Sequence, residues 1–164
     1  MIRWADLPGE EKALLNPAFI GVLVGDCARG YERESGQPMP FALAFVVVPF
    51  VLHRATRESL PRLVTTSMIV WLQNHPASRV GLAERARSLA PYVRVGILYG
   101  HEHQGVRIGD AAGLTSAVNQ RTRRGRQEAS GDTAACRARA EFVGRWWGRV
   151  NSPDTIMALL GVQP

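Results

Sequence analysis

The stretch Met39–Leu52, MPFALAFVVVPFVL, contains no charged side chain. A membrane-spanning helix needs about 20 apolar residues, so this stretch is too short to cross a bilayer. It also lacks the 3.6-residue alternation of a helix with one face in water, which indicates burial on most sides. We predict a short buried helix that begins near Pro40 and that Pro49 kinks or ends. The alternative is a strand, because Phe45–Val48 is rich in residues that favour strands.

Amphipathic helices are predicted on both sides of this stretch. Asn16 followed by Pro17 is typical of a helix start, because Asn caps free backbone N–H groups and Pro suits the first turn. Residues 35–38, SGQP, should end that helix. Near the other terminus, Asp132 or Thr133 can cap a helix that runs to about Val150. Residues 152–161 then predict a last short helix, with Ser-Pro at its start and Gly at its end.

The middle of the chain predicts three helices and a hairpin. The helices cover residues 61–74, 80–89 and 91–103, and two short strands follow at 106–108 and 114–118. Three helices followed by a hairpin is the order of a winged helix-turn-helix. In the third helix Arg94 is the only firmly basic residue, whereas a helix that reads base edges needs Arg, Lys, Asn or Gln. Its bulky side chains suit a protein surface better: Tyr92, Val95, Ile97 and Tyr99.

We therefore expect a mainly α fold with a small β-hairpin (α+β), formed by a winged helix-turn-helix-like core with additional N- and C-terminal helices. The length suits a single domain over residues 1–164. Its predicted parts are a helical part (1–58), a winged-helix-like part (60–118), a basic loop (119–131) and C-terminal helices (132–164).

The net charge of +6 is concentrated in one region. Residues 121–149 hold eight arginines and three acidic residues, whereas residues 1–120 have a net charge of only +2. Four arginines lie close together in the predicted basic loop, where they either contact phosphates or only keep the loop solvated. These candidates for nucleic-acid contact are Arg121, Arg123, Arg124 and Arg126.

Motifs that carry chemistry are missing from the sequence. The pair Gly21 and Gly25 lies within a predicted helix and indicates helix packing, not nucleotide binding. Cys27 and Cys136 are far apart and are expected to be reduced core thiols of a cytoplasmic protein. Residues 101–103, His-Glu-His, lack a third metal ligand nearby, which favours exposed residues at a helix end over a metal site. We expect no enzyme activity, catalytic residue, metal or cofactor.

Four blocks of the sequence resemble a known family. They are LLNPAFIGVLVGDCARGYE (14–32), MPFALAFVVVPFVLHRATRESLPR (39–62), GLAERARSLAPYV (81–93) and GRWWGRVNSPDTIMALLGVQP (144–164). Together they are similar to the middle component of bacterial three-component ABC-ATPase systems. The resemblance implies a small non-enzymatic subunit that binds an SMC- or Rad50-like ABC ATPase and couples it to a third component, the effector. Such systems are regarded as conflict or anti-phage defence modules. The resemblance does not extend over residues 103–132.

An adaptor of this kind requires a surface for its partners, and aromatic residues are candidates. We select Trp71, Tyr92, Trp146 and Trp147. Adjacent residues on a helix are rotated by about 100°, so Trp146 and Trp147 cannot share one narrow core face. Either the core is broad enough for both, or one of them lies at a rim or an interface.

Overall fold

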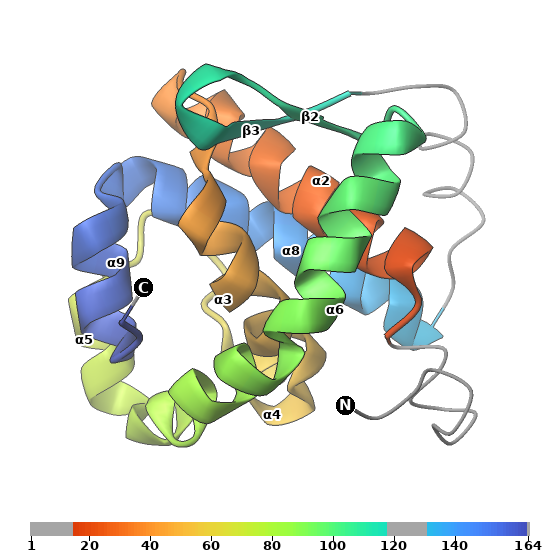
Figure 1. The fold of residues 1–164 in the computed structure, drawn as a ribbon. Coiled ribbons are helices and arrows are strands. Elements are labelled where there is room, and N and C mark those ends of the chain that lie inside the picture. Colours follow the sequence, from red (N-terminus) through yellow and green to blue (C-terminus); the bar gives the residue numbers. More distant parts are fainter. Residues whose placement is uncertain (1–14, 118–130, 164) are drawn as a thin grey trace.

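The structure is a computed structural model that describes residues 15–117 and 131–163. It is mainly helical and contains a small antiparallel sheet (Figure 1), as the α+β prediction states. The elements are α2 (Pro17–Ser35), β1 (Met39–Pro40), α3 (Phe41–Leu52), α4 (Arg54–Ser59), α5 (Met68–Asn74), η2 (Pro76–Arg79), α6 (Leu82–Glu102), β2 (Val106–Ile108), η3 (Asp110–Ala112), β3 (Gly113–Ser116), α8 (Gly131–Val150) and α9 (Pro153–Leu160).

Helix α3 is the centre of the core, as predicted. Eight of its twelve residues are buried, and it packs against α2, α4, α6, α8 and α9. The strand alternative for residues 45–48 is wrong. The helix continues for three residues past Pro49, so the proline does not end it. Pro49 itself is buried. Because apolar side chains surround α3, burial offsets the backbone hydrogen bond that Pro49 cannot make.

Helix α2 lies between α6 and α8 (Figure 1) and touches both through glycines. A Cβ atom on Gly144 of α8 would overlap the carbonyl group of Cys27 in α2. On the other side of α2, a Cβ atom on Gly21 would lie 2.7 Å from the Gly96 carbonyl oxygen of α6. Glycine is needed at such positions because the two backbones approach within the space of a side chain. The prediction that Gly21 serves helix packing is confirmed.

The sheet has the strand order β1-β3-β2, with both pairs antiparallel. The hairpin of β2 and β3 is confirmed, and Ile108 pairs with Leu114. The third strand is a correction to the predicted hairpin. Residues Met39 and Pro40, which we expected at the beginning of the buried helix, pair instead with Leu114 and Gly113 of β3. Such a two-residue strand is too short to show any alternation in the sequence.

The helix predicted over residues 61–74 is wrong in its first half, since α5 begins only at Met68. Two tryptophan side chains donate to backbone carbonyls between the end of α4 and the start of α5. Trp71 Nε1 donates to the Ser59 carbonyl oxygen at 2.9 Å, and Trp146 Nε1 donates to that of Thr66 at 2.7 Å. Ser67 then caps α5 by accepting from the Val70 N–H. The hydroxyl side chains of this segment also disfavour a helix, because they can hydrogen-bond to nearby backbone groups.

The two helices predicted at 80–89 and 91–103 form one helix, α6, which continues through Pro91. A proline inside a helix costs about 3 kcal/mol, but here α6 packs on α2 and α3 and buries apolar residues on both sides of Pro91. The buried side chains include Leu82 before the proline and Val93 and Ile97 after it. Because the predicted second and third helices are one helix, the winged helix-turn-helix arrangement is not confirmed.

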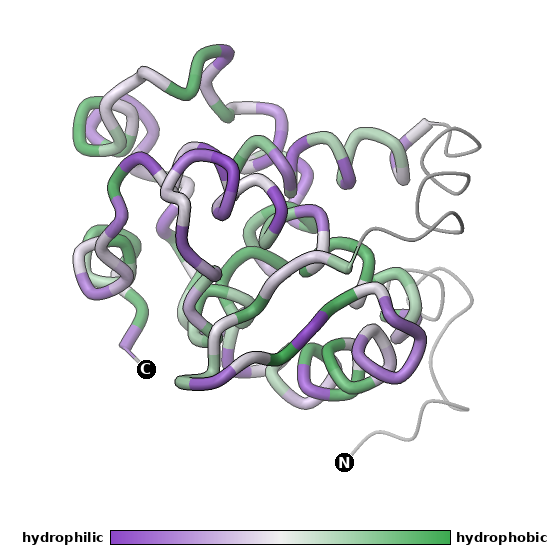
Figure 2. The backbone as a smooth tube through the Cα atoms, turned by 90° about the horizontal axis from the view of Figure 1, so that it is seen from above, coloured by the Kyte–Doolittle hydropathy of each residue, from purple (hydrophilic) through white to green (hydrophobic). Residues whose placement is uncertain are grey.

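The predicted ends of α2 and α9 are confirmed, whereas Asp132 and Thr133, predicted as alternative caps, lie inside α8, which already includes Gly131. Asn16 Oδ1 accepts from the Ala18 N–H at 2.9 Å, and Gly36 ends α2 in the left-handed conformation, with φ of 69°. Ser152 caps α9, which Gly161 ends with φ of 68°. Hydrophobic and hydrophilic residues alternate along the helical turns (Figure 2), as expected for helices that each bury one side.

Candidate protein-interaction surface

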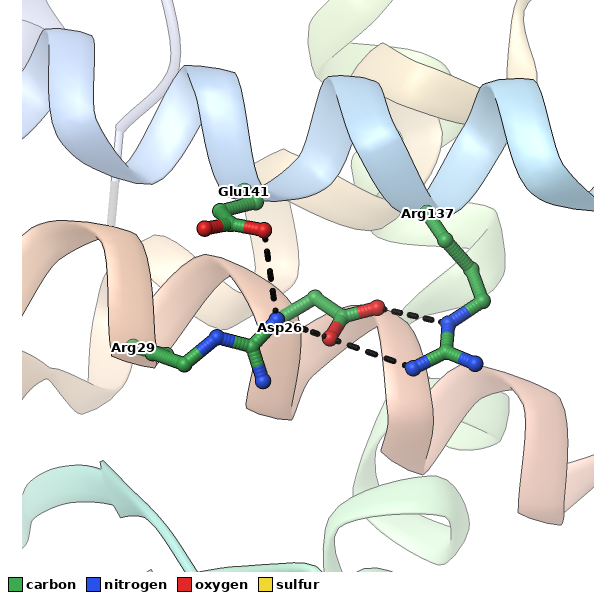
Figure 3. A network of polar contacts seen from close by, with 4 residues as sticks. All are labelled: Asp26, Arg29, Arg137 and Glu141. Atoms are coloured by element: carbon green, nitrogen blue, oxygen red, sulfur yellow. Dashed lines mark hydrogen bonds and ion pairs between the residues drawn. The ribbon is translucent and has the colours of Figure 1, made fainter. Parts of the chain in front are cut away.

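A buried ion-pair network joins α2 to α8 (Figure 3). The Asp26 side chain is 1% exposed and accepts from Arg137 Nε at 2.8 Å and from Arg29 Nη2 at 2.6 Å. Arg29 also reaches Glu141 Oε2 at 3.3 Å. Both oxygens of the Asp26 carboxylate are therefore engaged by guanidinium groups, and the network ties the two helices together.

Several arginines of the basic region 121–149 form contacts with other parts of the fold. Among the eight arginines of residues 121–149, Arg137 binds Asp26, while Arg145 and Arg149 form ion pairs with Glu34. Arg139 donates to the Pro61 carbonyl oxygen at 3.3 Å. These contacts stabilise helix packing and reduce the basic charge that α8 offers to a phosphate. The other four, Arg121, Arg123, Arg124 and Arg126, lie outside the described residues.

The tryptophans selected as interface candidates are core residues. Trp71, Trp146 and Trp147 are 3%, 1% and 0% exposed. Trp71 packs edge-on against Trp146 with ring centroids 5.2 Å apart, and Trp147 lies 5.9 Å from Phe50 of α3. The core is therefore broad enough for both adjacent tryptophans, and none of the three presents appreciable surface to a partner in this conformation. Tyr92 is partly buried at the edge of the core.

An apolar ridge runs along the outer face of α6, formed by Val95, Leu98 and Tyr99. Leu98 and Tyr99 lie three and four residues after Val95, so all three share one side of the helix. They are 51%, 58% and 37% exposed, whereas Val93 and Ile97 on the inner side are buried. Helix α6 thus has a second apolar side that is largely open to solvent, with the His103 ring stacked on Tyr99. Residues of this kind in one patch indicate a contact surface for a partner.

The remaining polar candidates are two histidines near the end of α6 and the two cysteines. His101 and His103 are exposed at the end of α6, where each imidazole contacts a nearby backbone carbonyl. No group of three metal-ligating side chains occurs within residues 15–117 and 131–163. Cys27 and Cys136 are free and buried, and burial raises the pKa of both thiols. Over the same residues, every helix is too short or too polar to cross a membrane.

Comparison with known families decides the identity of the chain. The model of the ABC-three component (ABC-3C) system Middle Component 3 family matches residues 4–164. The chain belongs to this family. No curated protein and no solved structure matches it. The resemblance seen in four sequence blocks is thereby confirmed, and Middle Component 3 is one component of a system that includes others.

The ridge agrees only in part with the residues that the sequence predicts for a protein surface. Val95 and Tyr99 were noted as bulky residues suited to a protein surface, and both are exposed. Ile97, predicted together with them, faces the core. Leu98 belongs to the exposed ridge but is not among the residues predicted for a protein surface. The spacing in the sequence could have identified Leu98, because Leu98 and Tyr99 lie three and four residues after Val95.

Proposed function

We propose that this protein is a non-enzymatic adaptor that binds the SMC- or Rad50-like ABC ATPase of its system and couples it to a third, effector component. Membership of the ABC-3C Middle Component 3 family supports an accessory role of this kind. The proposal includes a cytoplasmic location, which rests on the two cysteines expected to be reduced, and a part in anti-phage defence, which rests on the resemblance. It also treats residues 1–164 as a single domain.

The observation that carries this proposal is the apolar ridge on α6. Leu98 is 58% exposed beside Val95 and Tyr99, and burying this apolar surface against a partner would be favourable. The inner side of the same helix is already packed on α2 and α3, so the ridge is held on a rigid support. A rigid support lowers the ordering cost of association, which favours an interaction role.

The buried charged groups support a non-enzymatic role, since they have structural functions. Asp26 joins α2 to α8 through two arginines. Arg57 is 4% exposed, donates to the Val51 carbonyl at the end of α3 at 2.9 Å, and forms an ion pair with Asp132. Charges held between helices in this way contribute to stability and are closed to a substrate.

The test is co-expression with the ABC ATPase component of the same system, followed by size exclusion. We expect a stable complex, and Leu98→Lys should weaken it by at least about tenfold, because the substitution removes an apolar contact and inserts a charge. The matched control is Leu63→Lys, since Leu63 is 66% exposed outside the ridge. Clean separation of the two wild-type proteins would refute the proposal.

Nucleic-acid binding through the arginine-rich segment is the second candidate. The observation that favours it is the net charge of +5 over residues 121–149. Arg137, Arg145 and Arg149 form ion pairs within the fold. The residues that we propose to contact DNA are therefore Arg121, Arg123, Arg124 and Arg126. Replacing those four with Gln should weaken DNA binding and flatten its dependence on salt. Failure of the wild-type protein to bind DNA at low salt would exclude this candidate.

A further inference from the structure

A groove of about 820 Å³ lies between α3, α6 and the end of α9 with the segment that follows it. It is distinct from the ridge, because none of the ridge residues lines it. Its walls are largely apolar. Residues at its surface include Phe41, Phe45 and Val46 of α3, Ala86 and Ala90 of α6, and Val162.

The groove is open because several side chains of α6 that line it are small. Aromatic side chains of α3 form another part of its wall. Ala83, Ala86 and Ala90 follow at spacings of three and four, so all three face the groove from one side of the helix. Phe41 and Phe45 are only partly buried, and their ring centroids lie 5.4 Å apart. The result is an open apolar trough beside exposed aromatic surface, a composition typical of protein interfaces.

Two arginines of α6 also line the groove. Arg87 and Arg94 are exposed, and neither forms an ion pair within the described residues, unlike Arg29, Arg57 and Arg137. The guanidinium of Arg94 lies 5.9 Å from the centre of the Phe45 ring. No Asp or Glu lines the groove. Its charge is therefore positive, and seven residues of helix separate the two arginines by about 10.5 Å.

We propose that this groove binds an amphipathic helix of another component of the ABC-3C system, with an apolar face and two acidic residues about seven positions apart. The apolar face would cover Phe45 and the alanines, while the carboxylates would pair with Arg87 and Arg94. A phosphate backbone fits less well, because it has no apolar side to cover the trough. This inference rests on the proposed adaptor function and assigns it a second contact site.

The experiment measures binding of the full chain to the purified ATPase component and, separately, to the purified third component. The double variant Arg87→Glu and Arg94→Glu should lose at least about tenfold in affinity for one of them. Ala90→Trp, which fills the groove without changing charge, should weaken the same complex. The matched control, Arg33→Glu with Arg62→Glu, makes the same change of net charge at exposed positions outside the groove and should stay within about twofold.

The outcomes separate this inference from the proposed function. If the wild type binds neither component, the adaptor function is refuted and this site with it. If the wild type binds and the Arg87→Glu/Arg94→Glu variant binds equally well, the groove assignment alone is refuted. An equal loss in the Arg33→Glu/Arg62→Glu control would also overturn it, because general charge would then account for the effect.

Discussion

Replacing Gly144 with Ala tests the close contact between α2 and α8. The added Cβ atom would lie 2.8 Å from the carbonyl carbon of Cys27 and closer still to its oxygen, whereas ordinary contacts begin at 3.4 Å. The obstacle is backbone, so no side chain can rotate away. The two helices must therefore separate or slide along a contact that also holds Gly30, Gly148 and the Asp26 network.

The expected cost follows from two opposing effects. Overpacking a core costs about 1–3 kcal/mol, and a rigid backbone obstacle favours the upper end. Replacing Gly by Ala inside a helix gains about 1 kcal/mol of helix propensity. We therefore expect Gly144→Ala to lower the free energy of unfolding by about 2 kcal/mol or more.

Urea denaturation followed by circular dichroism measures this change, and two further glycines calibrate it. At Gly148 the new Cβ atom would lie 2.7 Å from the Tyr31 carbonyl oxygen, so Gly148→Ala should also be destabilising. At Gly109 the nearest atom is 3.6 Å away and φ is −93°, so Gly109→Ala should be neutral or slightly stabilising. If Gly144→Ala unfolds at the same urea concentration as Gly109→Ala, the contact argument is refuted.

Two further predictions concern polar groups. Asp26→Ala would leave Arg137 buried without its carboxylate and should lower the free energy of unfolding by about 3–5 kcal/mol in urea denaturation; a loss below about 1 kcal/mol would contradict the structural role. His53 caps α4 by accepting from the Thr56 N–H, and burial, followed by the charge of Arg85, lowers the pKa of its imidazole. Its contribution to stability is thus complete above the unfolded pKa of 6.5 and is lost as pH falls through the lower folded value. His53→Asn, which keeps a capping oxygen that does not titrate, should lose less stability than the wild type between about pH 7.5 and about pH 5.5; equal pH profiles would show that His53 does not act in this way.

The amino-acid sequence by itself determined the features that depend on near neighbours. Asn16 and Ser152 start helices and Gly36 and Gly161 end them, because a cap needs only the adjacent backbone. The buried nature of α3 followed from a run of apolar side chains that no solvated element would carry. The family was also readable from sequence blocks.

Only the tertiary structure decided the features that depend on distant partners. The non-helical segment 61–67 is held by Trp146 and Arg139, which lie far along the chain and donate to the Thr66 and Pro61 carbonyls. Helix α6 passes through Pro91 because apolar residues on both sides of the proline are buried in the core. Whether an apolar residue lies in the core or on the ridge also depends on what the fold places beside it. Trp147 is buried and Leu98 is exposed for that reason, although hydrophobicity alone favours burial of both.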